Sequence, residues 1–289
     1  MAGPPCEFFP LNRVAIVGVG LVGGSLGLAL RGRGLARRVV GVGRRQASLD
    51  RALAVGAVDE ATLDIRAAVA GANLIVLATP VGAMAAVAAQ AADAVSCGAV
   101  MTDVGSTKGQ LVRDLEAVAG DRFRYVGSHP MAGSEKRGVD EAVPGLFEGA
   151  LCFVTPTPSS DARAVAVVTE MWRSVGSRTR VLDPAEHDRL LARASHAPHL
   201  LAAALVNATP PDAMACAGPG FRDITRVASG DPRMWADVCR HNRERILDAL
   251  GSFEREIRVL RTILAQGGDP ELLAWLESAK AARDHHLRP

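Results

Sequence analysis

Two polar segments in the first half of the chain carry side chains that can do acid–base chemistry. Ser106 lies in Asp103-Val-Gly-Ser-Thr-Lys108, and His129 lies in Ser128-His-Pro-Met-Ala-Gly-Ser-Glu135. We predict that each segment follows the end of a strand, where parallel α/β sheets bind their ligands. A histidine that titrates near neutral pH can accept a hydroxyl proton while hydride leaves the same carbon. The two segments therefore predict a site in which His129 acts as a base.

Two further segments, in the second half, carry groups suited to binding. Ser195-His-Ala-Pro-His199 places His196 and His199 three residues apart on a predicted helix, so they share one face. Such a pair can also bind a metal, but no third ligand has suitable spacing, and we expect no metal. Phe221-Arg-Asp-Ile-Thr-Arg226 ends in an arginine that can hold a carboxylate through two hydrogen bonds.

A glycine-rich turn lies between a predicted strand at residues 13–17 and a predicted helix at residues 21–33. In the pattern Gly18-x-Gly20-x-x-Gly23, the first glycine permits a tight turn, the second lets a pyrophosphate approach the backbone, and the third lets the helix pack on the strand. The first helical residues, Leu21 and Val22, offer unpaired N–H groups to phosphates. This context predicts a dinucleotide site.

The end of the second predicted strand, residues 39–42, discriminates between cofactors. Folds that bind NAD usually carry an acidic residue about 20 positions beyond the glycines, on the ribose 2′-hydroxyl. Here that position is Gly43, and Arg44 and Arg45 follow. Guanidinium groups suit a 2′-phosphate, so we favour NADP with NAD possible, although two arginines can also simply be solvated in a loop. The remaining predicted cofactor residues, which follow later strands, are Thr79, Pro80 and Val104.

Alternating strands and helices position these groups. We predict strands at residues 13–17, 39–42, 74–78, 99–104, 124–127, 151–155 and 179–182, and intervening helices at 21–33, 83–95, 107–119 and 162–175. The alternation predicts an α/β fold with a Rossmann-type, doubly wound, mostly parallel sheet. After residue 183 only helices are expected, at 186–207, 235–264 and 271–282. We therefore predict a flexible arm (1–12), a dinucleotide-binding domain (13–183) and a helical substrate and dimerisation domain (184–289).

Composition excludes several classes of protein. The 289 residues are 48% hydrophobic, which excludes a disordered chain, and a net charge of +2 does not suit DNA binding. Aromatic residues are only 4%, too few for a platform that stacks single-stranded nucleic acid. The uncharged run at residues 14–30 holds five glycines, which suits neither a membrane span nor a signal peptide. Five cysteines without paired spacing fit a reducing compartment, so we expect a cytoplasmic protein without nucleic-acid or membrane partners.

The ordered set of motifs resembles the prephenate/arogenate (cyclohexadienyl) dehydrogenase family of tyrosine biosynthesis, from Arg13 to about Leu250. The resemblance implies an NAD(P)-dependent oxidative decarboxylation, of prephenate to 4-hydroxyphenylpyruvate or of arogenate to tyrosine. It also implies a homodimer formed through the helical domain, with a substrate cleft between the two domains.

The resemblance also implies roles for individual residues. His129 would take the proton of the ring hydroxyl, and Ser106 would contact that hydroxyl and the nicotinamide. Arg226 would bind the ring carboxylate, with Asp223 holding its guanidinium group. The other substrate-side residues that it implies are His196, His199, Glu135 and Trp235, of which the last two gate the cleft.

The chain departs from the family pattern in two places, and three alternative functions stay open. The missing acid after residue 42 puts NAD preference in doubt, and about 25 residues after Leu264 are too few for a regulatory domain. An aminodeoxyprephenate dehydrogenase of secondary metabolism fits the same motifs. A β-hydroxyacid-type dehydrogenase would need a catalytic lysine, and Lys280 is the only lysine in the helical half. A nucleotide-sensing binding protein would not need His129. The motifs do not separate prephenate from arogenate.

Overall fold

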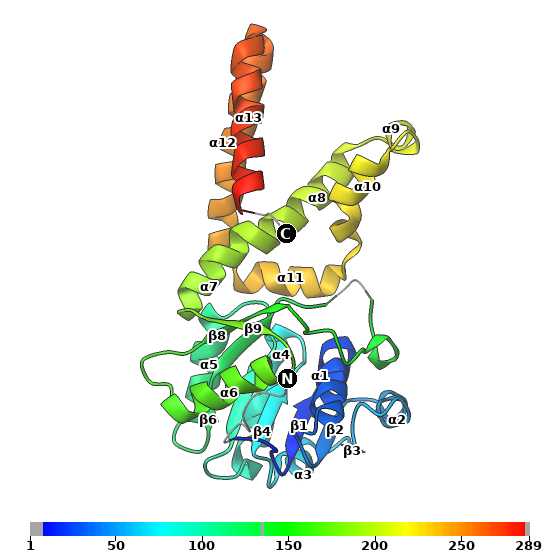
Figure 1. The fold of residues 1–289 in the computed structure, drawn as a ribbon, viewed down its shortest axis with the longest axis vertical. Helices are drawn as coiled ribbons and strands as arrows, with labels where there is room; N and C mark the ends of the chain where they lie inside the picture. The colour runs from blue at the N-terminus through cyan, green and yellow to red at the C-terminus, as the bar shows by residue number, and fades with distance from the viewer. Residues whose placement is uncertain (1–7, 134–135, 287–289) are drawn as a thin grey trace. The chain divides into compact units, whose positions relative to one another are not determined.

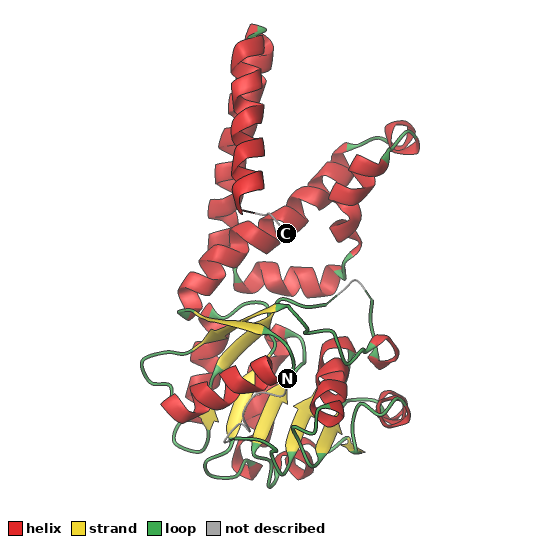
Figure 2. Cartoon of the chain, viewed as in Figure 1, coloured by secondary structure: helices red, strands yellow, loops and turns green. Residues whose placement is uncertain are grey.

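Short apolar runs form the centre of a six-stranded parallel sheet in the computed structural model, which describes residues 8–133 and 136–286 (Figure 1, Figure 2). The strands are β1 (Val14–Val17), β2 (Val39–Val42), β3 (Glu60–Thr62), β4 (Leu74–Leu77), β5 (Val100–Asp103) and β6 (Arg124–Tyr125). Their spatial order is β3-β2-β1-β4-β5-β6. This is the order of doubly wound dinucleotide-binding sheets, so the predicted fold class is confirmed.

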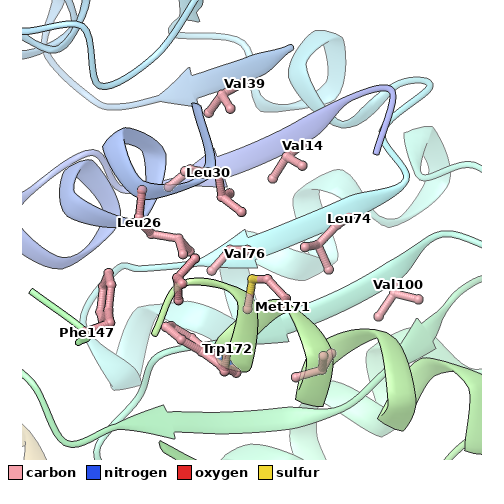
Figure 3. Close-up of a cluster of buried hydrophobic side chains, with 14 of the residues drawn as sticks. Val14, Leu26, Leu30, Val39, Leu74, Val76, Val100, Phe147, Met171 and Trp172 are labelled. Carbon is pink, nitrogen blue, oxygen red and sulfur yellow. The ribbon is translucent and has the colours of Figure 1, made fainter. Parts of the chain in front are cut away.

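Helices cover both faces of this sheet. Successive strand residues point to opposite faces, so Val14 packs with α1 (Leu21–Gly32) and α6 (Ala162–Ser174), whereas Ala15 packs on the other side. Figure 3 shows the first cluster, in which Trp172 of α6 is fully buried. The helices of the second face are α3 (Ile65–Val69), α4 (Val81–Ala91) and α5 (Gly109–Ala119). Each large aliphatic side chain buried here contributes about 1.5–3 kcal/mol.

Three elements between β2 and β4 were not predicted from the sequence: α2 (Gln46–Ala54), β3 and α3. All three are short, and β3 is only half-buried. Their sequences therefore contain neither a continuous apolar run typical of a buried strand nor a helical repeat of apolar residues over several turns. Two short 3-10 turns lie later in the chain, Ala92–Ala94 directly after α4 and Val139–Glu141 before the strand at Leu151–Thr155.

A second, three-stranded sheet was also not predicted. It consists of β7 (Gly127–Pro130), β8 (Leu151–Thr155) and β9 (Arg178–Val181), with β7 antiparallel to β8 and β9 parallel to it. The predicted strand at 124–127 is wrong in extent, because β6 ends at Tyr125 and a new strand starts at Gly127. His129 therefore lies within a strand and pairs with Phe153, instead of following a strand end.

The predicted helix at 186–207 is three segments: α7 (Pro184–Leu191), a π-helical turn (Ala192–His196) and α8 (Ala197–Ala208). Asp183 caps α7 by accepting hydrogen bonds from the backbone N–H groups of Ala185 and Glu186. Pro198 cannot donate to the Ala194 carbonyl, and its ring would clash with that carbonyl in an α-helix. The wider π turn avoids the clash.

Shorter helices follow: α9 (Pro211–Ala215), α10 (Pro219–Thr225), a 3-10 turn (Arg226–Ser229) and α11 (Pro232–His241). The predicted helix at 235–264 is interrupted, because α11 ends before Asn242 and α12 (Arg243–Gln266) begins after it. The side chain of Asn242 is buried and bonds to two other segments, as described below, which favours a break there.

Contacts divide the chain into two compact units, Met1–Arg243 and Glu244–Pro289. The second unit holds most of α12 together with α13 (Asp269–His286), and Trp275 donates a hydrogen bond to Glu256 between them (3.4 Å). Because residues 184–243 belong to the same compact unit as the sheets, the boundary near residue 183 stays a prediction. No helix in the described ranges is long and apolar enough to cross a membrane.

Residues 8–12, the described part of the expected N-terminal arm, pack against the sheet domain. Leu11 exchanges backbone hydrogen bonds with Leu35 (2.9 Å) and Arg37 (2.8 Å), and Phe8 and Phe9 contact the core. Residues 1–7 of the expected arm lie outside the described residues.

Candidate active site

The glycine turn joins β1 to α1 at the carboxyl edge of the sheet. Gly18 has a φ of 103°, and a Cβ atom there would lie 2.5 Å from the carbonyl oxygen of Ala78. A Cβ atom at Gly23 would lie 2.2 Å from the carbonyl oxygen of Gly18, so this glycine is needed for packing. A Cβ atom at Gly20 would meet no described atom within 4 Å. The turn therefore leaves open space at the one glycine predicted to face a pyrophosphate.

Neighbouring strand ends complete this edge. The first N–H groups of α1, from Leu21 and Val22, have no intrahelical acceptor because of helix geometry. The hydroxyl of Thr79, after β4, is buried and has no hydrogen-bond partner among the described residues. Pro80 occupies the N-cap position of α4, and Val104 lies half-buried after β5. An open glycine, a helix N-terminus and an unpaired buried hydroxyl fit a dinucleotide.

The end of β2 carries the residues predicted to select the cofactor. Gly43 packs closely on Leu49, since a Cβ atom there would lie 3.0 Å from a methyl group of that side chain. Arg44 and Arg45 are both exposed, and neither forms an ion pair with a described residue. Two arginines thus follow the end of β2, the position at which dinucleotide-binding folds contact the ribose.

His129 sits in a chain of hydrogen bonds that crosses from β7 to α7. Its Nδ1 atom lies 2.9 Å from Nε2 of His187, and Nδ1 of His187 lies 2.9 Å from Oδ1 of Asp188. The carboxylate of Asp188 also accepts hydrogen bonds from the backbone N–H groups of Lys108 and Gly109, both at 2.7 Å. All three side chains in the chain of hydrogen bonds are buried. The start of α5 therefore anchors the carboxylate that orients both histidines.

Burial determines the protonation states of the three side chains in this series of hydrogen bonds. It lowers the pKa of His129 well below the usual range, and the nearby His187 and Lys108 lower that pKa further. The pKa of His187 is also lowered by burial, although Asp188 opposes the shift. Burial alone would raise the pKa of Asp188, but hydrogen bonds from His187, Gly109 and Lys108 bring it below the usual value. An ionised Asp188 accepts from His187, and His187 accepts from Nδ1 of His129, which leaves Nε2 of His129 as a proton acceptor.

A fully buried ion pair between Lys108 and Asp103 holds the Ser106 loop. Asp103 also accepts hydrogen bonds from the backbone N–H of Gly105 (2.7 Å) and from the hydroxyl of Tyr125 (2.7 Å). Because a buried charge without partners costs several kcal/mol, these bonds keep the loop in one arrangement. Ser106, half-buried in this loop, follows the end of β5 as predicted.

His196 and His199 share one face, as expected, and both contact the indole ring of Trp235. His199 stacks on it with ring centres 3.5 Å apart, and His196 meets it edge-on at 6.2 Å. Burial lowers the pKa of His196 to about 4, although the Asp188 carboxylate opposes the shift. Nε2 of His196 and Nδ1 of His199 are buried without hydrogen-bond partners among the described residues. Unpaired buried nitrogens here fit a polar ligand.

Gly230 makes the Trp235 stack possible. A Cβ atom at Gly230 would lie 2.6 Å from Nε1 of Trp235 and 3.0 Å from Cε1 of His199. Every other residue type would therefore displace one of these two rings.

The other predicted substrate residues lie on neighbouring elements. Asp223 belongs to α10 and Arg226 begins the 3-10 turn that packs on α8, and both are exposed. Glu135 lies outside the described residues. In the ranges that the structure describes, no group of three or more His, Cys, Asp or Glu side chains is placed to hold a metal ion.

Sequence reasoning missed three residues of the site: His187, Asp188 and Asn242. The adjacent His187 and Asp188 were a usable signal, because a histidine beside an acidic residue within a predicted helix suggests an oriented imidazole. Asn242 donates to the Asp188 carbonyl (2.8 Å) and lies 3.1 Å from Nδ1 of His196. Nothing in the sequence around Asn242 marks that role.

Comparison with known proteins places this geometry in one family. The nucleotide-binding domain model of prephenate dehydrogenase matches residues 26–181, and its dimerization domain model matches residues 183–278. The chain is 34% identical to the cyclohexadienyl dehydrogenase of Zymomonas mobilis, over 96% of this chain and 99% of that protein.

Solved structures of similar proteins point to the same family. Prephenate dehydrogenase from A. aeolicus, in complex with hydroxyphenyl propionate and NAD+, has a TM-score of 0.89 and 34% identity, over 95% of this chain and 98% of that one. Arogenate dehydrogenase from Synechocystis has a TM-score of 0.83 and 30% identity, over 95% and 100%. The chain belongs to the prephenate dehydrogenase family.

Proposed function

We propose that this protein catalyses the oxidative decarboxylation of prephenate, arogenate or both, with hydride transfer to NAD(P). The observation that carries the proposal is the chain of hydrogen bonds from His129 through His187 to Asp188, which provides a neutral, oriented base. Relatives named for prephenate, arogenate and cyclohexadienyl substrates support the substrate class.

The proton is handled by His129. Its Nε2 atom accepts the proton of the ring hydroxyl as hydride leaves the same carbon, and His187 and Asp188 stabilise the imidazolium that forms. Ser106 orients the ring hydroxyl from the loop that Asp103 and Lys108 hold. The ring carboxylate leaves as CO2, and its bonding electrons enter the ring, which becomes aromatic. The phenolate oxygen that results takes the proton back from Nε2 of His129, which restores the neutral base.

A bound NAD(P) supplies the hydride acceptor. The residues that would hold it are the glycine turn and its helix start (Gly18, Gly20, Leu21, Val22, Gly23), the later strand ends (Thr79, Pro80, Val104) and the end of β2 (Gly43, Arg44, Arg45).

The substrate's other groups meet residues from the helical segments. Arg226 binds the ring carboxylate before it leaves, with Asp223 positioning the guanidinium group. His196, His199 and Trp235 bind near the side chain of the substrate, and the two unpaired histidine nitrogens support this assignment. Glu135 closes the cleft together with Trp235.

NADP is the favoured cofactor in this proposal. The exposed arginines after Gly43 support it, because a 2′-phosphate gives both a partner. NAD stays possible, since the A. aeolicus relative was solved with NAD+.

The proposed assembly is a homodimer formed through a helical domain at residues 184–289. The matched dimerization domain model supports this. So do the exposed apolar side chains of α12 and α13, among them Leu247 (61% exposed), Leu264 (58%) and Leu273 (57%).

Initial rates for prephenate and arogenate, each with NAD+ and NADP+, test the function directly. Turnover of at least one substrate, and a loss of about 100-fold or more in His129→Gln with dinucleotide binding intact, are expected for a base. Absence of turnover in all four combinations, with a folded protein, contradicts the proposal. Undiminished turnover in His129→Gln contradicts the assignment of the base.

A further inference from the structure

Helix α11 touches both sides of the candidate site. Near its start, Trp235 stacks on His199, and directly after its end Asn242 bonds to the Asp188 carbonyl and lies beside His196. Between them in the sequence, Asp237 reaches the start of α4, next to the predicted cofactor residues Thr79 and Pro80. One ten-residue helix therefore contacts the side formed by His196 and His199, called the histidine face below, and also the start of α4 beside the predicted dinucleotide site.

The contact with α4 is made by a carboxylate. Oδ2 of Asp237 accepts a hydrogen bond from the backbone N–H of Gly82 at 2.8 Å. The N-cap residue Pro80 offers no capping side chain, and the first turn of α4 has no acidic residue. Asp237 thus supplies from another helix the cap that α4 lacks, and its charge suits the positive end of the helix dipole. Its side chain is only 15% exposed.

The fit between the two helices is tight. A Cβ atom at Gly82 would lie 2.6 Å from Oδ1 of Asp237, so a larger residue at Gly82 forces the carboxylate away. Arg240 (3.4 Å) and His241 (3.5 Å) approach the same oxygen, which holds the carboxylate from its own helix. A displacement of Thr79 and Pro80, which connect β4 to α4, would therefore be transmitted to α11 through Gly82 and Asp237.

We propose that Asp237 is a positioning residue that makes dinucleotide binding and ring-substrate binding depend on each other. Ordering of the α4 start by a bound dinucleotide fixes α11, which in turn sets Trp235 against His199. Conversely, a ligand bound on the histidine face stabilises the segment of Thr79 and Pro80, which binds the dinucleotide in this proposal. The identity of the two ligands rests on the proposed function.

The test measures binding rather than turnover. Hydroxyphenyl propionate, a ligand of the A. aeolicus relative, is titrated by calorimetry with and without saturating NAD+ or NADP+. In the unmodified protein, the dissociation constant is expected to fall by at least about 5-fold when dinucleotide is bound. The coupling ratio is the dissociation constant without dinucleotide divided by that with dinucleotide. In Asp237→Ala this ratio is expected to lie within about twofold of one. Hydrogen exchange at the start of α4 is expected to speed up in the same variant, without any ligand.

Controls separate positioning from general stability. Asp161→Ala removes the cap of α6, which Asp161 provides to the N–H of Ala164 at 2.8 Å, and should keep the full ratio. Asp237→Asn retains an oxygen that can accept from Gly82, so it should restore most of the ratio. Gly82→Ala should lower the ratio in the unmodified protein, yet change nothing further in Asp237→Ala, where the methyl group has room.

The outcomes are distinct. A full ratio in Asp237→Ala, or equal effects of Gly82→Ala in both backgrounds, overturns the role of Asp237. An unmodified protein that binds both ligands independently also overturns it, while the proposed function stands. An unmodified protein that binds no dinucleotide and turns over neither substrate rejects the proposed function, and the coupling with it.

Discussion

Nε2 of His187 lies 2.9 Å from Nδ1 of His129, although 58 positions separate the two residues in the chain. The first belongs to helix α7 and the second to strand β7, so the base and the group that orients it come from different parts of the fold. The imidazole of His129 therefore depends on the packing of α7 for its tautomer as well as its orientation.

Replacing His187 by alanine should lower kcat without weakening dinucleotide binding. The variant removes the acceptor for Nδ1 of His129, so the base loses both its tautomer and the stabilisation of its charged form. We expect kcat to fall by about 10–100-fold, within the range of acid–base contributions. Steady-state rates and dinucleotide titrations measure the two quantities. An equal substitution at the exposed His285 serves as the control, and an unchanged kcat would remove His187 from the mechanism.

The pH dependence of stability should reflect the buried His196. The unfolded chain binds a proton at this residue near pH 6.5, whereas the folded protein binds it only near pH 4. The contribution is therefore fully present above about pH 6.5 and is lost as the pH falls toward 4. The shift corresponds to about 3 kcal/mol in the free energy of unfolding.

Urea denaturation at about pH 7 and about pH 4.5 measures this effect. His196→Gln should lose less stability between the two conditions than the unmodified protein does, because glutamine does not titrate. A parallel pH dependence in the two proteins would show that His196 is not the titrating group.

Two glycines of the turn should respond differently to alanine. Gly23→Ala places a methyl group 2.2 Å from the carbonyl oxygen of Gly18, so the midpoint of thermal unfolding should fall. Gly20→Ala meets no described atom within 4 Å, so the fold should be unaffected while dinucleotide affinity drops at least about 10-fold. Scanning calorimetry and dinucleotide titration distinguish the two. Tight dinucleotide binding by Gly20→Ala would mean that the pyrophosphate lies elsewhere.

Arg44→Ala should weaken NADP more than NAD. A guanidinium group on the 2′-phosphate forms charge-assisted hydrogen bonds, each contributing about 1.5–3 kcal/mol, and NAD has no such phosphate. We expect at least a 10-fold larger rise in the NADP dissociation constant. Equal losses for both cofactors would show that Arg44 does not contact the 2′-phosphate.

Arg226→Ala should act mainly on substrate affinity. Loss of a charged hydrogen bond to the ring carboxylate costs about 1.5–3 kcal/mol, which corresponds to a rise in KM of about 10–150-fold. The KM for the dinucleotide should stay near that of the unmodified protein. If the substrate KM is unchanged, another cation binds the carboxylate.

The parts of the fold that rest on local pattern could be predicted from the sequence. The apolar runs of β1 and β4, the glycine turn and the loss of strands after residue 183 all carry their signal within a few residues. The segments that carry Ser106 and His129 could be selected as candidates because their motifs are local as well.

The parts that depend on distant contacts could not. Strand β7 pairs with β8, which is distant in the sequence, and approaches it closely at Gly127, where a Cβ atom would lie 2.5 Å from Oγ1 of Thr155. The pairing of His129 with His187, and the use of Asn242 to end α11, likewise depend on segments that only the folded chain brings together.

The π turn before α8 sets the phase between the two ends of a continuous helical stretch. A π turn holds one residue more than an α turn, and each α-helical residue rotates the chain by about 100°. Deleting one residue between Asp188 and His196 would therefore swing α7, with its histidine and carboxylate, by about that angle around the axis of α8. A relative could retain every site side chain and still present them in the wrong directions. The number of residues in this interval is thus as informative about function as their identity.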